Sequence, residues 1–136
     1  KVFDLLAALL EWNDLTLSTP TTASISAKDQ EAMQSLKHFL LQNYSTKVDL
    51  QRLAQMCYMS KSKLTYLFRM LYGTTIYEFI LACRIDRAKE LLADREKKLS
   101  EIAALVGYER QSSFSAAFHQ KTGITPNEFR RQFWNK

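Results

Sequence analysis

The chain has 136 residues, of which 46% are hydrophobic and 24% charged, enough for one domain with a buried core. Three Gly and two Pro argue against a turn-rich β fold and favour helices. No apolar run approaches the roughly 20 residues that span a bilayer, and acidic residues interrupt the first apolar stretch, so membrane and secreted proteins are disfavoured.

Residues 2–12 (VFDLLAALLEW) are apolar on nearly every side, which is typical of a helix packed on both flanks. Residues 16–26 hold seven Ser or Thr and read as a linker. We therefore expect residues 1–15 to be the C-terminal helix of a missing upstream effector or dimerisation domain. The domain proper is expected over 27–136.

The first helix of that domain is predicted to start at Ser26, with Asp29 three residues on, and to end near Asn43. A short helix over 50–57 follows, with Asp49 as its N-cap. Its inward face holds four apolar residues at helical spacing: Leu50, Leu53, Ala54 and Cys57.

A tight turn then leads to Ser60, a natural N-cap for a helix that stops at Gly73. The inward face of this helix has apolar residues at i, i+3, i+4 and i+7: Leu64, Leu67, Phe68 and Leu71. The capping box from Thr75 to Glu78 opens a long helix that is predicted to reach Ala93.

The same pattern occurs a second time. The segment LQRLAQMCYMSKSKLTYLFRMLYGTTIYEF (50–79) aligns with LSEIAALVGYERQSSFSAAFHQKTGITPNEF (99–129), at an offset of 49 that becomes 50 after one extra residue in the second turn. A repeated core pattern with matching caps predicts an all-α fold with two helix-turn-helix subdomains joined by a long linker helix and preceded by an extra N-terminal helix.

Two such units suggest DNA as a partner, because an α-helix fits the major groove of the B-form duplex. The expected recognition helices are 61–72 and 111–122. A rotation of about 100° per residue sets four side chains of the first on or beside its outward face: Ser62, Thr65, Tyr66 and Arg69. In the second copy the corresponding set is Gln111, Ser112, Ser115, Ala116 and His119.

The linker helix has about 18 residues and is therefore about 27 Å long. It would hold the two recognition helices near the ~34 Å spacing of successive major-groove segments. Charge agrees with a polyanionic partner. Residues 1–46 carry three Lys against five acids (net −2), whereas 47–136 carry 16 Lys or Arg against nine acids (net +7). The same net charge of +7 would also be found on a domain whose basic residues are merely solvated at the surface.

Residues 45–134 resemble the AraC/XylS family of bacterial transcription regulators. The likeness is carried by EIAALVGYERQSSFSAAFHQKTGITPNEFR (101–130), SKSKLTYLFRMLYGTT (60–75) and RIDRAKELL (84–92). The resemblance implies an all-α domain of seven helices and binding to promoter DNA as an activator or repressor, in the cytoplasm. It also implies contact with RNA polymerase and a small-molecule effector bound by an N-terminal domain. A similarity to members that regulate siderophore genes suggests a siderophore effector.

The family's base-reading positions, carried over by this resemblance, fall on Ser62, Lys63, Thr65, Tyr66, Gln111, Ser112, Ser115 and Ala116. Tyr66 and Ala116 stand where some members place Arg, so we expect more direct readout from the first unit and more reliance on phosphate contacts and DNA shape in the second. The expected contacts to the DNA backbone are Lys61, Arg69, Arg84, Arg110, Lys121 and Arg130.

Each of those cations has an alternative role. Arg84 could instead pair with acids of its own helix or elsewhere in the core, Arg130 could simply end a helix, and the others could be solubilising charges.

Two other functions remain open at this point. The chain could be a helical protein-interaction adaptor that does not read DNA, or an enzyme, such as a DNA-repair fusion with Cys57 or Cys83 as methyl acceptor. Neither Cys lies in a cationic setting that would lower a thiol pKa. No metal site or cofactor is expected, because zinc needs about four ligands and the two His are distant from the Cys residues.

Overall fold

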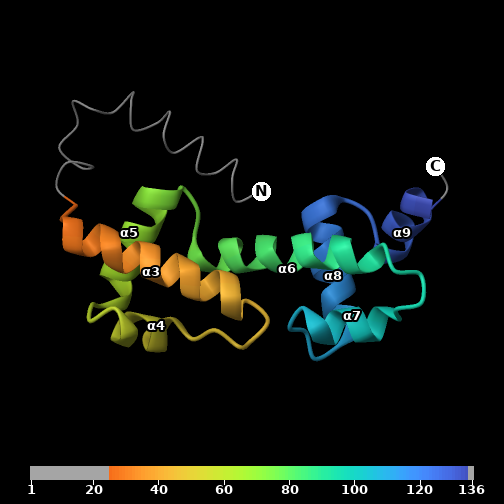
Figure 1. Ribbon diagram of the computed structural model, residues 1–136, viewed down its shortest axis with the longest axis horizontal. Coiled ribbons are helices and arrows are strands. Elements are labelled where there is room, and N and C mark those ends of the chain that lie inside the picture. The colour runs from red at the N-terminus through yellow and green to blue at the C-terminus, as the bar shows by residue number, and fades with distance from the viewer. Residues whose placement is uncertain (1–24, 135–136) are drawn as a thin grey trace, which may run out of the picture. The chain divides into compact units, whose positions relative to one another are not determined.

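The computed structural model describes residues 25–134, and the predicted helix over 1–15 and most of the 16–26 linker lie outside them. The described part is all-helical with seven helices and no strand, which confirms the predicted fold class (Figure 1). None of these helices is long and apolar enough to cross a membrane. The chain divides into two compact units, of which the first holds residues 25–43 with 48–80 and the second holds 44–47 with 81–134.

The first unit contains α3 (Ala27–Asn43), α4 (Leu50–Met56) and α5 (Lys61–Tyr72), followed by the start of α6 (Ile76–Leu92). The predicted caps are present: Ser26, Asp49 and Ser60 each accept a backbone N–H through the side chain, and the helix α5 ends at Gly73 in the left-handed conformation. Both α3 and α4 pack on α5. Their buried side chains form the core: Met33, Leu36, Leu40, Leu53, Ala54, Leu64, Leu67 and Phe68.

Two predicted core positions of the short helix are only half-buried. Leu50 lies at its first residue, and Cys57 lies just beyond its end because α4 stops at Met56. In α5, Tyr72 is buried and Leu71 half-buried, so the inward face turns slightly at the last residue.

The second unit contains α7 (Leu99–Leu105), α8 (Gln111–Thr122) and α9 (Pro126–Trp134), together with the rest of α6. Its core is a cluster of buried residues from α6, α7 and α8: Ile85, Ala88, Leu91, Leu92, Ile102, Ala103, Val106, Phe114 and Phe118. The short segment Tyr44–Lys47 belongs to this unit. Arg84 holds it, because its Nε and Nη2 donate to the carbonyls of Tyr44 and Thr46 at 2.7 and 3.1 Å.

The repeat found in the sequence is confirmed at the level of single hydrogen bonds. In the first turn the Met59 N–H donates to the Ala54 carbonyl at 3.0 Å, and 49 residues later the Tyr108 N–H donates to the Ala103 carbonyl at 2.8 Å. The capping box of Thr75 and Glu78 is repeated by Thr125 and Glu128, with two reciprocal bonds in each case. The ring pairs Phe68–Phe79 and Phe118–Phe129 both have centroids 5.7 Å apart.

Candidate nucleic-acid interface

The helix α5 presents one polar face to solvent. Leu64, Leu67 and Phe68 are buried beneath it, which fixes the rotation of the helix about its axis. The predicted outward residues are accordingly exposed: Ser62, Thr65, Tyr66 and Arg69. Tyr66 is 50% exposed and therefore does not fold down onto the core. No Asp or Glu occurs in 61–72, so no side chain of α5 itself repels phosphates.

The helix α8 has the same construction with smaller side chains. Phe114 and Phe118 are fully buried, and neither ring is available for stacking on bases. The predicted outward residues Gln111, Ser112 and Ala116 are exposed, whereas Ser115 is half-buried. The helix also lacks acidic residues, and its last turn carries His119 and Lys121.

Four of the six cations predicted to contact the DNA backbone are exposed: Lys61, Arg69, Arg110 and Lys121. Lys61 is the first residue of α5, and Arg110 directly precedes α8. These positions lie beside the backbone amides that remain free at the start of a helix, where anions are favoured.

The other two predicted contacts, Arg84 and Arg130, use their guanidinium groups inside the second unit. Arg84 binds the two carbonyls of the 44–47 segment and lies over the Tyr108 ring, 5.0 Å from its centroid. Arg130 donates to the carbonyls of Leu92, Asp94 and Lys97, at 3.2, 3.2 and 2.7 Å. The sequence suggests acidic partners for Arg84 and a helix end for Arg130. The partners are instead backbone carbonyls, including one at the C-terminus of α6.

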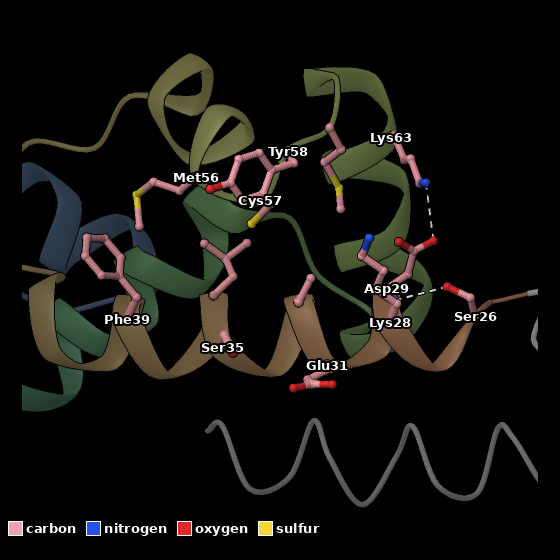
Figure 2. A pocket seen from close by; sticks show the side chains of 13 residues that line it. Ser26, Lys28, Asp29, Glu31, Ser35, Phe39, Met56, Cys57, Tyr58 and Lys63 are labelled. Atoms are coloured by element: carbon pink, nitrogen blue, oxygen red, sulfur yellow. Dashed lines mark hydrogen bonds and ion pairs between the residues drawn. The ribbon is translucent and has the colours of Figure 1, made fainter.

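Lys63, one of the predicted base-reading residues, has a partner that the sequence did not indicate. Its Nζ lies 3.3 Å from Oδ2 of Asp29, on the first turn of α3. Figure 2 shows this pair at one end of a pocket lined by α3, the α4–α5 turn and the start of α5. The ammonium group is therefore directed toward α3.

The turn between α4 and α5 carries a further feature that sequence reasoning missed. Tyr58 has a φ of +55°, a left-handed conformation that is uncommon for a residue other than glycine. Its counterpart in the second unit, 49 residues on, is Gly107, which also has a positive φ. The aligned repeat contained this signal, since a tyrosine stands where the second copy has a glycine.

The two cysteines lie in surroundings that oppose reactivity. Cys83 is buried, and burial raises the pKa of the Cys57 thiol above its ordinary value. A thiol with a raised pKa carries less thiolate at neutral pH, and the thiolate is the nucleophile.

A family model described as a helix-turn-helix domain matches residues 53–132. The chain is 32% identical over 119 residues to the probable transcriptional regulator LumQ of Photobacterium leiognathi, covering 84% of this chain and 48% of that protein. It is 31% identical over 103 residues to the bifunctional transcriptional activator/DNA repair enzyme AdaA of Bacillus subtilis (strain 168), covering 76% and 49%. The chain thus spans about half the length of these curated relatives.

Among solved structures, a transcriptional regulator from Chromobacterium violaceum, described as an AraC-type DNA-binding domain-containing protein, is 25% identical with a TM-score of 0.68, covering 80% of this chain and 97% of that one. The family match extends from α4 to α9 and so takes in both helix-turn-helix units. The chain belongs to the AraC/XylS family of helix-turn-helix transcription regulators.

Proposed function

We propose that this protein binds double-stranded promoter DNA in a sequence-specific manner and regulates transcription from it, with α5 and α8 in successive major-groove segments. The observation that carries the proposal is the repeated unit itself. Each copy buries one side of its second helix and exposes on the other a polar face without acidic residues. An α-helix with such a face fits the major groove.

The residues proposed to meet base edges are Ser62, Thr65, Tyr66, Gln111, Ser112, Ser115 and Ala116. Lys63, predicted as an eighth, is not included because its ammonium group is paired with Asp29 on α3. Gln111 suits adenine and the Ala116 methyl group suits a thymine methyl. Lys61, Arg69, Arg110 and Lys121 are proposed to contact phosphates. Arg84 and Arg130 are assigned a structural role instead, because two guanidinium nitrogens of each already donate to carbonyls of the second unit.

The larger protein is proposed to contain an upstream effector-binding or dimerisation domain that ends in residues 1–15 and is joined by the 16–26 linker. The match to only about half the length of the curated relatives supports such a domain. RNA polymerase is the proposed protein partner and a small molecule, of siderophore type, the proposed effector. A DNA partner of this kind implies a cytoplasmic location at the nucleoid.

Catalysis is not part of the proposal, although AdaA is named as bifunctional. A methyl acceptor in DNA repair must be an accessible thiolate. Cys83 is buried and the pKa of Cys57 is raised, so neither thiol suits that role.

In-vitro selection of duplexes from a random pool tests the proposal. We expect enriched sites with two half-sites about 10.5 base pairs apart, one turn of the duplex. The change Gln111→Ala should then alter the preferred base at one position, whereas Lys61→Ala should weaken all sites alike and reduce the salt slope by about 0.9. If no duplex is enriched and none binds at low salt, the protein is an adaptor and the proposal is wrong.

A further inference from the structure

The ion pair between Lys63 and Asp29 joins two side chains whose main chains are held in place. Lys63 is the third residue of α5, and its N–H donates to the cap hydroxyl of Ser60 at 3.1 Å. Asp29 is on the first turn of α3, and its N–H donates to the cap hydroxyl of Ser26, also at 3.1 Å. Because α3 packs on α5, the two capped turns keep the carboxylate within reach of the ammonium group.

Of the two charged side chains in the pair, Asp29 is the more shielded from solvent. The Asp29 side chain is 22% exposed, against 51% for Lys63. The ammonium group must leave this carboxylate before it can approach a phosphate beside α5. Asp29, on α3, also places a negative charge next to the start of α5, whose own side chains are all cationic or neutral.

The second unit has no equivalent restraint among its described residues. At the repeat offset of 50, the position of Lys63 is taken by Ser113, which is exposed and uncharged. The pair is therefore a feature of the first unit alone, the unit in which we expect more direct base readout.

We infer that Asp29 is a positioning residue that determines specificity: it holds Lys63 on α3 and so lowers the affinity of α5 for DNA of any sequence. The inference rests on the proposed function. Phosphate contacts add affinity without sequence information, so withholding one of them lowers non-specific binding and leaves discrimination to the base contacts.

The test uses the 136-residue chain and a duplex of scrambled sequence about four helical turns long, with affinities measured from about 50 to 200 mM salt. Asp29→Asn frees Lys63 for a phosphate. We expect a roughly two- to five-fold gain in affinity and a salt slope steeper by about 0.9. Asp29→Glu keeps the carboxylate and should stay near the wild type.

Two controls separate positioning from a simple change of charge. Glu31→Gln changes the net charge by the same amount on the same helix, at a residue that makes no ion pair within the described part of the chain, and should give a smaller gain and no change in slope. In a Lys63→Met background, Asp29→Asn should no longer raise affinity or slope. A purely electrostatic effect of the carboxylate on DNA would persist there.

The inference is overturned if Asp29→Asn behaves like Glu31→Gln, or if its gain survives the loss of Lys63, while the wild type still binds duplex. If the wild type binds no duplex at any salt concentration, the proposed function fails and the inference fails with it. Thermal unfolding of each variant shows whether the first unit has remained folded.

Discussion

Tyr58, in the turn between α4 and α5, has a strained backbone conformation that burial of its side chain does not offset. Its φ of +55° costs an L-residue about 1–2 kcal/mol, and the residue is 96% exposed. The second unit avoids this cost by having Gly107 at the matching position.

Replacing Tyr58 with Gly should therefore raise the free energy of unfolding. The relief of strain exceeds the added freedom of the unfolded chain, about 0.4–1 kcal/mol, so a net gain of roughly 0.5–1 kcal/mol is expected in urea titrations. Tyr58→Ala removes the same ring but keeps the strain, and should give no gain. A loss of stability in the glycine variant would show that the ring makes contacts worth more than the strain.

Gly107 faces the opposite constraint. A Cβ built there would lie 2.6 Å from the backbone oxygen of Ser45, which cannot move aside as a flexible side chain could. Gly107→Ala is expected to cost more than the roughly 1–2 kcal/mol of left-handed strain alone. Gly123→Ala is the matched control, because its φ is also positive and no atom lies within 4 Å of its Cβ position. Equal melting temperatures for the two variants would contradict the steric argument.

At the scale of elements, the two capping boxes predict how stability depends on pH. The Thr75 N–H and hydroxyl lower the pKa of Glu78, and Thr125 does the same for Glu128. The unfolded chain, with a Glu pKa of about 4.3, then binds more protons than the folded one in acid. The stability that these carboxylates contribute is present above that pKa and is lost as the pH falls through the folded pKa.

Glu78→Gln and Glu128→Gln should each flatten the decline of melting temperature between about pH 5 and pH 3, since the substituted side chain no longer titrates. Glu109→Gln provides the comparison, at an exposed glutamate with no hydrogen bond in the part of the chain that the structure describes. If all three variants follow the wild-type profile, the caps do not contribute to acid sensitivity.

These same elements show what the sequence could and could not predict. The caps at Ser26, Asp49 and Ser60, and the box at Thr75, depend on residues within a few positions of one another, so the sequence alone predicts each of them. The spacing of the apolar residues likewise predicts which side of α5 and α8 faces solvent.

The partners of the charged side chains could not be predicted in this way. Lys63 and Asp29 are 34 positions apart, and only the packing of α3 on α5 brings them together. Arg84 and Arg130 bind backbone carbonyls 33 to 40 positions away. Because every residue has a backbone carbonyl, the residue type does not indicate which one accepts the bond. The periodic pattern also assigns Cys57 to the core, because it does not mark where α4 ends.

At the scale of the whole molecule, the two units are proposed to divide the reading of DNA unequally. Exposed Thr65 and Tyr66 offer polar groups on α5, whereas the corresponding positions of α8 hold half-buried Ser115 and the methyl group of Ala116. Thr65→Ala and Tyr66→Ala should each reduce discrimination at one base pair by about 1 kcal/mol, and Ser115→Ala should have a smaller effect.

Competition binding with single-base variants of the selected site measures this difference. Each variant must be compared at one salt concentration, because phosphate contacts change affinity with salt. A larger loss of discrimination from Ser115→Ala than from Tyr66→Ala would reverse the proposed division between the units.

The position of residues 44–47 has a consequence for engineering. They lie between α3 and α4 in the sequence, yet Arg84 and the approach of Ser45 to Gly107 hold them in the second unit. A chimaera made by one crossover after α5 would import a foreign copy of this segment against the native Arg84. Exchanging operator preference between relatives therefore calls for a graft in two pieces, 25–43 and 48–80, with the four intervening residues left in the host.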